Sequence, residues 1–166
     1  FEREITPITL SDGTVVSKDD GPRDGTTAEK LSALKPVFRP DGKVTAGNAC
    51  PLNDGAAAVV VMSEDRANAL GITPLARIVS SGVSGLDPEI MGLGPIEASR
   101  QALRRAGLTI DDIDLAEINE AFAAQVLPSA KHLGISWDKL NVNGGAIALG
   151  HPFGMTGARI IDRKST

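Results

Sequence analysis

The chain has 166 residues, of which 42% are apolar, and its formal net charge at pH 7 is −4. This length and composition predict one ordinary domain with a buried core. The acidic balance argues against nucleic acid or an anionic membrane surface as the main partner, because such binding needs clustered Lys and Arg. No apolar run approaches the ~20 residues of a membrane span, and no charged-then-apolar leader opens the chain.

The chain contains a single cysteine, Cys50, and two histidines. One cysteine excludes an internal disulfide framework, and this set is too small for a zinc cluster, so we expect no metal site. The simplest compartment for such a chain is the reducing cytosol, which predicts a cytoplasmic protein. Because the first residue is Phe1 and not Met, we expect the chain to begin partway through a longer protein.

The first part of the chain reads as a short strand at 4–10 followed by an exposed, polar segment at 11–39. The apolar run Ala56–Met62 is typical of a strand buried on both faces of a parallel sheet, although its alanines leave a buried helix open. Ser63 can cap a following helix, and Gly71 suits the exit of that helix. Together these residues predict a strand followed by a helix.

The same pattern recurs in the rest of the chain. Strands are predicted at Leu75–Ser80, Asp114–Ile118 and Leu140–Asn143, a helical turn at 111–112, and helices at Pro95–Ala106, Glu120–Leu133 (bent at Pro128) and Thr156–Ile161. Strands that alternate with helices predict an α/β domain with a largely parallel sheet.

Two polar residues stand at predicted strand ends. Asn119 ends one strand, and His151 follows the next strand along the chain. In open α/β sheets, ligands bind outside the carboxyl ends of the strands, so both residues are expected to face one crevice. The glycines of Val142–Arg159 allow close approach of the main chain to a ligand, and Pro152 biases His151 towards an extended backbone. The pattern predicts a loop that passes a thin ligand along a firmly oriented imidazole.

Simpler interpretations of the same residues stay open. Glycine clusters after strands are often tight turns, and a lone histidine is often a structural hydrogen-bond donor. Asn119 alone is a plausible helix cap, Glu120 suits the positive end of a helix, and His132 reads as a surface or capping residue. The loop contains neither a Walker motif nor GxGxxG, which makes a phosphate cradle a weak interpretation.

Four stretches, taken in order, resemble the thiolase family of acetyl-CoA acetyltransferases and 3-ketoacyl-CoA thiolases. They are "VTAGNACPLNDGAAAVVVMS" (44–63), "MGLGPIEAS" (91–99), "EINEAFA" (117–123) and "NVNGGAIALGHPFGMTGAR" (141–159). The likeness extends from about Lys35 to Ile160 and is weaker before it. It implies a thiolase-like α/β fold, with layered α/β halves and a mixed, largely parallel sheet, of which this chain would hold an incomplete part.

The resemblance also implies a chemistry. Thiolases use a cysteine to pass an acyl group between thioesters, either condensing two acetyl-CoA or cleaving a 3-ketoacyl-CoA with CoA. Coenzyme A would be substrate and product, with no separate cofactor. His151 matches the histidine of the family's GHP motif, which donates a hydrogen bond to the thioester or enolate oxygen. Asn119 matches the asparagine of NEAF, which holds a water as the second donor of this oxyanion hole, where each donor is worth ~2.7–4 kcal/mol.

The resemblance assigns no nucleophile to this chain. The family's acylated cysteine belongs to a segment that would precede Phe1, and its acid/base cysteine to one that would follow Thr166. Cys50 matches a position where many thiolases have a serine that lines the pantetheine pocket, so pocket lining or packing is favoured over catalysis. Further substrate or CoA contacts are implied for Met91, an acyl-pocket wall or else a core methionine, and for Ala121, Phe122 and Gly150.

Carried onto this chain, the family's architecture predicts three parts. Residues 1–43 would be the tail of a CoA-covering loop domain, 44–72 the closing unit of the N-terminal half, and 73–166 a truncated C-terminal half, whose ending "IDRKST" departs from the family. The complete enzyme would be a homo-oligomer, a dimer or tetramer. "CPLND" with "DPEIMGLGP" favours members that degrade lipid (β-oxidation) or sterol chains. Two alternatives remain: a non-catalytic CoA-binding or assembly module complemented by another chain, and a nucleotide-binding α/β domain.

Overall fold

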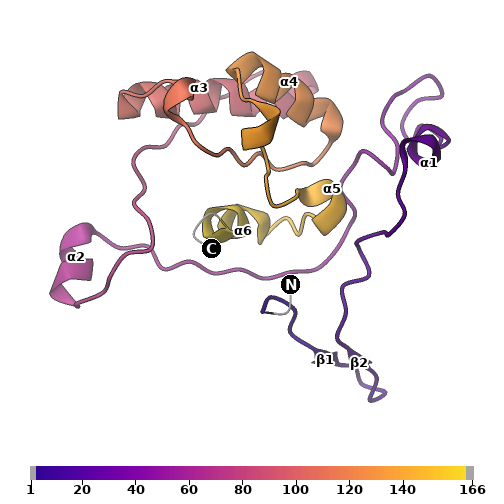
Figure 1. Ribbon diagram of the computed structural model, residues 1–166, viewed down its shortest axis with the longest axis horizontal. Helices are drawn as coiled ribbons and strands as arrows, with labels where there is room; N and C mark the ends of the chain where they lie inside the picture. Colours follow the sequence, from indigo (N-terminus) through magenta and orange to yellow (C-terminus); the bar gives the residue numbers. More distant parts are fainter. Residues whose placement is uncertain (1–2, 164–166) are drawn as a thin grey trace.

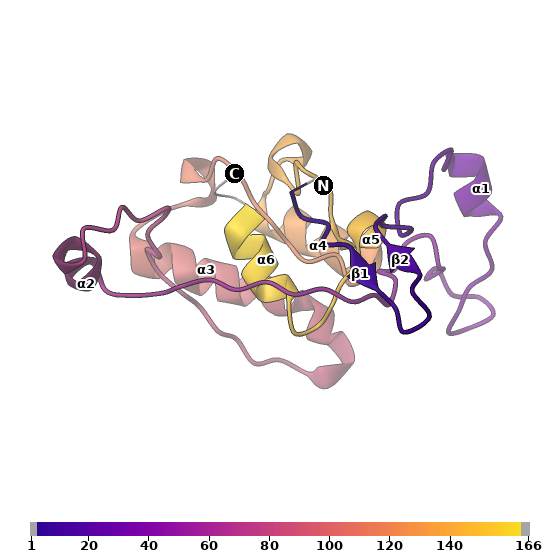
Figure 2. The ribbon, with the colours of Figure 1, turned by 90° about the horizontal axis from the view of Figure 1, so that it is seen from below.

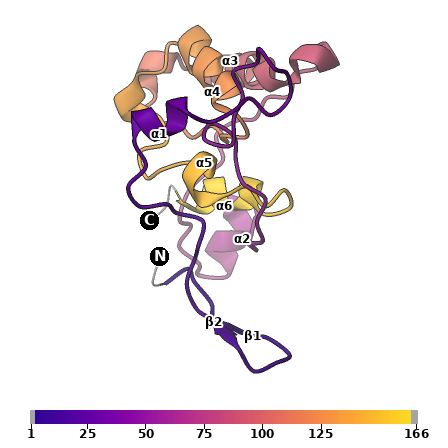
Figure 3. The ribbon, with the colours of Figure 1, turned by 90° about the vertical axis from the view of Figure 1, so that its right-hand side faces the viewer.

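A computed structural model describes residues 3–163, so the outermost residues of the predicted parts 1–43 and 73–166 lie outside the described range. Helices α3 and α4 lie side by side in one layer, and α5 and α6 lie beneath them (Figure 1). The hairpin β1–β2 projects away from these layers (Figure 3), and α2 stands apart at one end (Figure 2). The elements are β1 Ile8–Thr9, β2 Val15–Val16, α1 Ala28–Ser32, α2 Glu64–Ala69, α3 Gly94–Ala106, α4 Ala123–Leu133, α5 Ala146–Leu149 and α6 Thr156–Arg163, with 3₁₀ turns η1 Pro88–Leu93, η2 Ile110–Asp112 and η3 Trp137–Lys139.

The helices with strong local signals form where the sequence predicts them. The α3 helix has Pro95 in its first turn, where the missing N–H costs nothing, and it ends at Gly107, whose φ of 70° favours glycine. At the start of α2, Ser63 Oγ accepts a hydrogen bond of 3.2 Å from Arg66 N, as predicted for its cap. The turn η2 and the helix α6 also lie at their predicted positions.

The α4 helix differs from its prediction at one end. It begins at Ala123 and not at Glu120, because Phe122 has an extended backbone (φ −147°, ψ 139°) and forms an antiparallel bridge with Ala49. Pro128 lies inside the helix, which continues to its end at Gly134. The face of α4 that packs against α3 and η1 buries Val126, Ser129, Ala130 and Leu133.

The largely parallel sheet does not form among residues 3–163. Residues 56–62 and 75–80 form no helix or strand, and no backbone hydrogen bond joins them to another described segment. A strand exists only through hydrogen bonds to a neighbouring strand, so these two predictions of strands are wrong for the chain as it stands. The other two predicted strands meet in a single parallel bridge, between Ala116 and Leu140.

The buried core is smaller than the composition suggests. The accessible surface is 12333 Å², whereas a compact protein of 17.2 kDa would expose about 7,800 Å². Much of the excess is apolar, because Val60 is 87% exposed and Leu75 is 85% exposed in the unpaired segments. The buried apolar residues of the described chain are Ala67, Val126, Ala130, Leu133 and Ala146. Among the described residues, no helix combines the length and apolar character needed to cross a membrane.

Candidate active site

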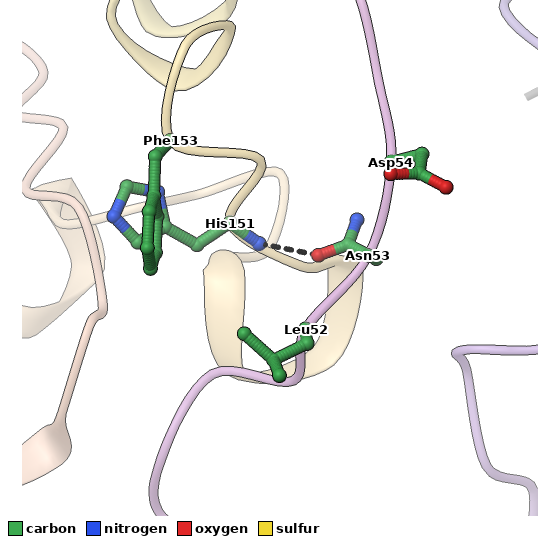
Figure 4. A pocket seen from close by; sticks show the side chains of 5 residues that line it. All are labelled: Leu52, Asn53, Asp54, His151 and Phe153. Carbon is green, nitrogen blue, oxygen red and sulfur yellow. Dashed lines mark hydrogen bonds between the residues drawn. The ribbon is translucent and has the colours of Figure 1, made fainter.

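The structure brings the two predicted polar residues into direct contact. Asn119 Nδ2 lies 3.2 Å from His151 Nε2, and both side chains are partly buried. A cavity of about 370 Å³ opens beside the histidine and is lined by Leu52, Asn53, Asp54, His151 and Phe153 (Figure 4). This volume falls within the range of small-molecule sites, ~300–1,000 Å³.

His151 is held from three sides. Its backbone N–H donates a 2.8 Å hydrogen bond to Asn53 Oδ1, drawn as the dashed line in Figure 4. Its ring Nδ1 lies 2.7 Å from Thr156 Oγ1, and Phe153 packs beside the ring with the centroids 4.8 Å apart. The imidazole points away from Asn53 (Figure 4), so the main-chain contact fixes the loop while Thr156 and Phe153 orient the ring.

Gly150 is required at the position before the histidine. Its φ is +95°, a conformation that L side chains rarely adopt, and a Cβ at this position would collide with the Asn53 amide. Only glycine therefore lets Asn53 reach the backbone of His151.

We expect Gly150→Ala to release this loop. Adding strain of ~2 kcal/mol should accelerate hydrogen exchange at the His151 amide by about 30-fold, as measured by NMR. The matched control is Gly154→Ala in the same loop, because a Cβ there meets no atom within 4 Å. Equal exchange rates in the two variants would contradict the role given to Gly150.

Asn119 is positioned through both of its neighbours by Asn141. Asn141 Oδ1 accepts from Ile118 N at 2.9 Å, and its Nδ2 donates to Ile118 O at 2.9 Å and to Glu120 Oε1 at 2.8 Å. The side chain of Asn141 thus supplies the hydrogen bonds that an adjacent strand would otherwise make, from a backbone with φ of 47°. Asn119 is held at a fixed place between two anchored residues.

The capping interpretations of Asn119 and Glu120 are wrong. The cap position of α4 is Phe122, so Asn119 lies outside the helix end. Glu120 Oε2 accepts a 3.1 Å hydrogen bond from Ile147 N, in the first turn of α5, and so its carboxylate acts at a different helix from the one predicted. His132 is exposed at the end of α4, as predicted.

The side-chain oxygen of Asn119 has no hydrogen-bond partner among the described groups. Its Oδ1 is buried and accepts no hydrogen bond from any described protein group. Buried polar atoms are nearly always partnered, so this oxygen is an unsatisfied acceptor next to the histidine.

The other predicted contact residues do not line the cavity. Cys50 N donates to Ala121 O at 3.0 Å, which joins the Cys50 segment to the one that carries Asn119. Phe122 packs edge-on against Phe38, with ring centroids 6.1 Å apart. Met91 is 76% exposed on η1, so the alternative of a core methionine is wrong. Their roles towards a substrate stay predictions.

The sequence interpretation missed Asn53, Phe153, Asn141 and Thr156. Asn53 contacts a residue 98 positions away, which no local pattern can indicate. Thr156 was predicted only as the start of a helix, although its position five residues after the histidine is a usable signal. Within residues 3–163, no group of three or more His, Cys, Asp or Glu side chains is placed to hold a metal ion.

Comparison with known families identifies the class of protein. The family model of the thiolase N-terminal domain matches residues 1–65, and that of the thiolase C-terminal domain matches residues 72–164. The chain belongs to the thiolase family. The predicted boundary at residue 43 stays a prediction.

Individual relatives agree with this assignment. The chain is 52% identical to a probable acetyl-CoA acyltransferase of Staphylococcus epidermidis and 54% identical to the acetyl-CoA acetyltransferase of Escherichia coli, in both cases over 97% of the chain and 42% of the relative. It is 57% identical to a 3-ketoacyl-CoA thiolase of Cronobacter sakazakii, over 96% of the chain and 43% of the relative. The chain thus spans about two fifths of the length of the relatives it matches.

Solved structures confirm the predicted thiolase fold. The acetyl-CoA acetyltransferase of Bacillus anthracis matches with a TM-score of 0.87 at 54% identity, over 94% of this chain and 40% of that one. Human mitochondrial 3-ketoacyl-CoA thiolase, solved in complex with CoA, matches with a TM-score of 0.84 at 48% identity, over 96% and 40%. The dimeric peroxisomal thiolase of Saccharomyces cerevisiae matches with a TM-score of 0.86 at 44% identity, over 99% and 42%.

Proposed function

We propose that this chain is the part of a thiolase that supplies the histidine and asparagine of the oxyanion hole. The reaction is acyl transfer between CoA thioesters, either thiolysis of a 3-ketoacyl-CoA or condensation of acetyl-CoA. The observation that carries the proposal is the 3.2 Å contact between Asn119 Nδ2 and His151 Nε2 in a chain of this family. A cavity beside this pair offers room for a thioester group.

The geometry suggests how the pair acts on a thioester. Attack on the carbonyl carbon places negative charge on its oxygen, and hydrogen-bond donors already fixed near that oxygen stabilise the charge. His151 supplies one donor from Nε2. We assign the second donor to a water held by Asn119, whose Oδ1 has no hydrogen-bond partner among the described groups.

The nucleophile must come from elsewhere in the active enzyme. Cys50 is the single sulfur nucleophile of the sequence, and it does not line the cavity beside His151.

Coenzyme A serves as substrate and product, no separate cofactor takes part, and the complete enzyme is a homo-oligomer in the cytoplasm. Its role is lipid metabolism, including fatty acid β-oxidation.

The test is a chimera in which this chain replaces the matching segment of the Escherichia coli acetyl-CoA acetyltransferase. We expect the chimera to cleave acetoacetyl-CoA with a kcat comparable to that of the parent enzyme. A chimera that folds and binds CoA but shows no turnover would contradict the proposal.

A second candidate is an assembly or CoA-binding module that another chain completes. The exposed apolar segments favour this candidate. The side chains of Val60, Val61 and Ile78 are mostly exposed to solvent, and exposed apolar patches often mark interaction sites. Calorimetry of the 166-residue chain with CoA, together with an inactive chimera, would separate this candidate from the first.

In the chimera, we expect Asn119→Ala to lower kcat by about 10²-fold, because the water that completes the oxyanion hole loses its acceptor. The free energy of unfolding should change little, since Asn119 caps no helix. Asn68→Ala, on α2, is the matched control. A variant that loses ~1 kcal/mol of stability but keeps its activity per folded molecule would mean that Asn119 is only structural.

A further inference from the structure

We propose that Glu120 is a positioning residue whose carboxylate sets the separation between Asn119 and His151. Glu120 follows Asn119 directly in the chain, and its side chain holds the start of α5, the short helix that leads to His151. This inference deepens the proposed function and rests on it for its catalytic meaning. The separation of the two side chains is nevertheless a property of the chain itself, so it can be measured without turnover.

The carboxylate of Glu120 receives one hydrogen-bond donor at each oxygen. Its Oε1 accepts a 2.8 Å hydrogen bond from Asn141 Nδ2, and its Oε2 accepts a 3.1 Å hydrogen bond from Ile147 N. A carboxylate accepts at both oxygens, whereas the amide of glutamine accepts at one atom and donates at the other. The two contacts therefore need a carboxylate, because a glutamine of the same shape can satisfy only one of them.

Backbone groups determine which end of the Asn141 amide faces Glu120. Ile118 N can only donate, and it lies 2.9 Å from Oδ1 of Asn141. Ile118 O can only accept, and it lies 2.9 Å from Nδ2 of Asn141. The nitrogen of this amide is therefore the atom that Glu120 meets. Asn141 is 9% exposed, so leaving its N–H groups without an acceptor is costly.

The second contact of Glu120 leads to His151 through α5. Gly145 is the cap residue of α5 and has no side chain that could accept a hydrogen bond, so the N–H of Ile147 is satisfied by a carboxylate 27 residues earlier. At the other end of α5, Gly150 N donates a 2.8 Å hydrogen bond back to the first turn, and His151 follows directly. One hydrogen-bonded turn thus joins the carboxylate of Glu120 to the histidine.

The start of α5 leaves space for this carboxylate. A Cβ at Gly145 would collide with the carboxyl carbon and both carboxylate oxygens of Glu120. The φ of Gly145 is −129°, which any residue adopts, so the backbone conformation does not demand glycine here. Glycine at this position is therefore required by the carboxylate of Glu120.

These contacts close a ring around the candidate site. Glu120 is bonded covalently to Asn119 and through a hydrogen bond to α5, and His151 at the end of α5 returns to within 3.2 Å of Asn119 Nδ2. Donors stabilise an oxyanion only when they are held in the right geometry, and a misplacement of ~1 Å can cost ~10²-fold in rate. Removing the carboxylate opens the ring and should impair the chemical step more than substrate binding.

The first test measures this separation by NMR of the 166-residue chain. An NOE between the side-chain NH₂ of Asn119 and the ring hydrogens of His151 reports their proximity. We expect it in the parent chain, and we expect it to be lost or at least halved in Glu120→Gln. The matched control is Glu64→Gln on α2, because this carboxylate is exposed and pairs with Arg77. Absence of the NOE from the parent, or an unchanged NOE in Glu120→Gln, would overturn the inference.

The second test uses the chimera. Glu120→Gln is expected to lower kcat per folded molecule at least ~10-fold and to leave KM within ~3-fold, because a displaced donor weakens binding of the transition state alone. A merely structural role of Glu120 would lower the midpoint of urea unfolding but leave kcat per folded molecule unchanged, and that result would contradict the inference. Glu64→Gln should keep the parent values.

A double-mutant cycle shows that the carboxylate acts through its place beside α5. Gly145→Ala alone should lower kcat, because its methyl group displaces the carboxylate of Glu120. In the Glu120→Ala background that methyl group enters vacated space, so Gly145→Ala should lower kcat by less than a further ~3-fold. Losses that multiply would overturn the inference. If Glu120→Gln does not fold, this cycle and the NOE in Gly145→Ala decide. An inactive unsubstituted chimera with the expected NOEs would refute the proposed function alone.

Discussion

The 166-residue chain alone is expected to cleave acetoacetyl-CoA at least ~10⁴-fold more slowly than a full-length thiolase. Thiol chemistry needs a sulfur held against the oxyanion donors, and Cys50 is absent from the lining of the cavity beside His151. The effects of catalytic groups that act as a unit are not additive. An oxyanion hole without its nucleophile therefore retains only a small part of the catalytic rate. Exposed apolar segments further favour aggregation or pairing of the free chain.

The assay is thiolysis by the purified chain, with its mass confirmed and Cys50→Ser measured in parallel. Robust turnover that disappears in Cys50→Ser would make Cys50 the nucleophile and overturn this assignment. Turnover that survives the substitution would instead indicate contamination by a full-length enzyme.

In the chimera, His151→Ala is expected to lower kcat by 10²-fold or more. The ring contributes a donor to the developing oxyanion, and its Nε2 lies 3.2 Å from Asn119 Nδ2. The backbone N–H of His151 donates to Asn53 Oδ1, and this hydrogen bond does not involve the imidazole. The loop should therefore keep its conformation in the variant.

His132→Ala is the matched control, since His132 is exposed at the end of α4. Urea unfolding should give similar midpoints for both variants. A folded His151→Ala protein with the turnover of the unsubstituted chimera would remove His151 from the mechanism.

Local chemistry made much of this fold predictable. Pro95 and Gly107 mark the two ends of α3, and Ser63 marks the start of α2, because a cap depends on residues within one helical turn. The rule that ligands bind at the carboxyl ends of strands also placed Asn119 and His151 together, although residues 3–163 contain only one bridge of the expected sheet.

The rest depends on segments far apart in the chain. The apolar run at 56–62 has strand character, but its pairing needs a neighbour that no pattern within the run can supply. The late start of α4 follows from the pairing of Phe122 with Ala49, more than seventy residues earlier. Asn53 and Thr156 acquire their roles only once the glycine loop has folded back onto them.

The contact between Asn53 and His151 also has a kinetic consequence. It closes a loop of 98 residues, and the entropy of closing a loop grows with its length. Helices such as α3 and α4 rest on local contacts and form rapidly, whereas contacts of long sequence separation form late. The imidazole therefore reaches its final orientation near the end of folding, so a partly folded molecule has its helices in place before it has a site.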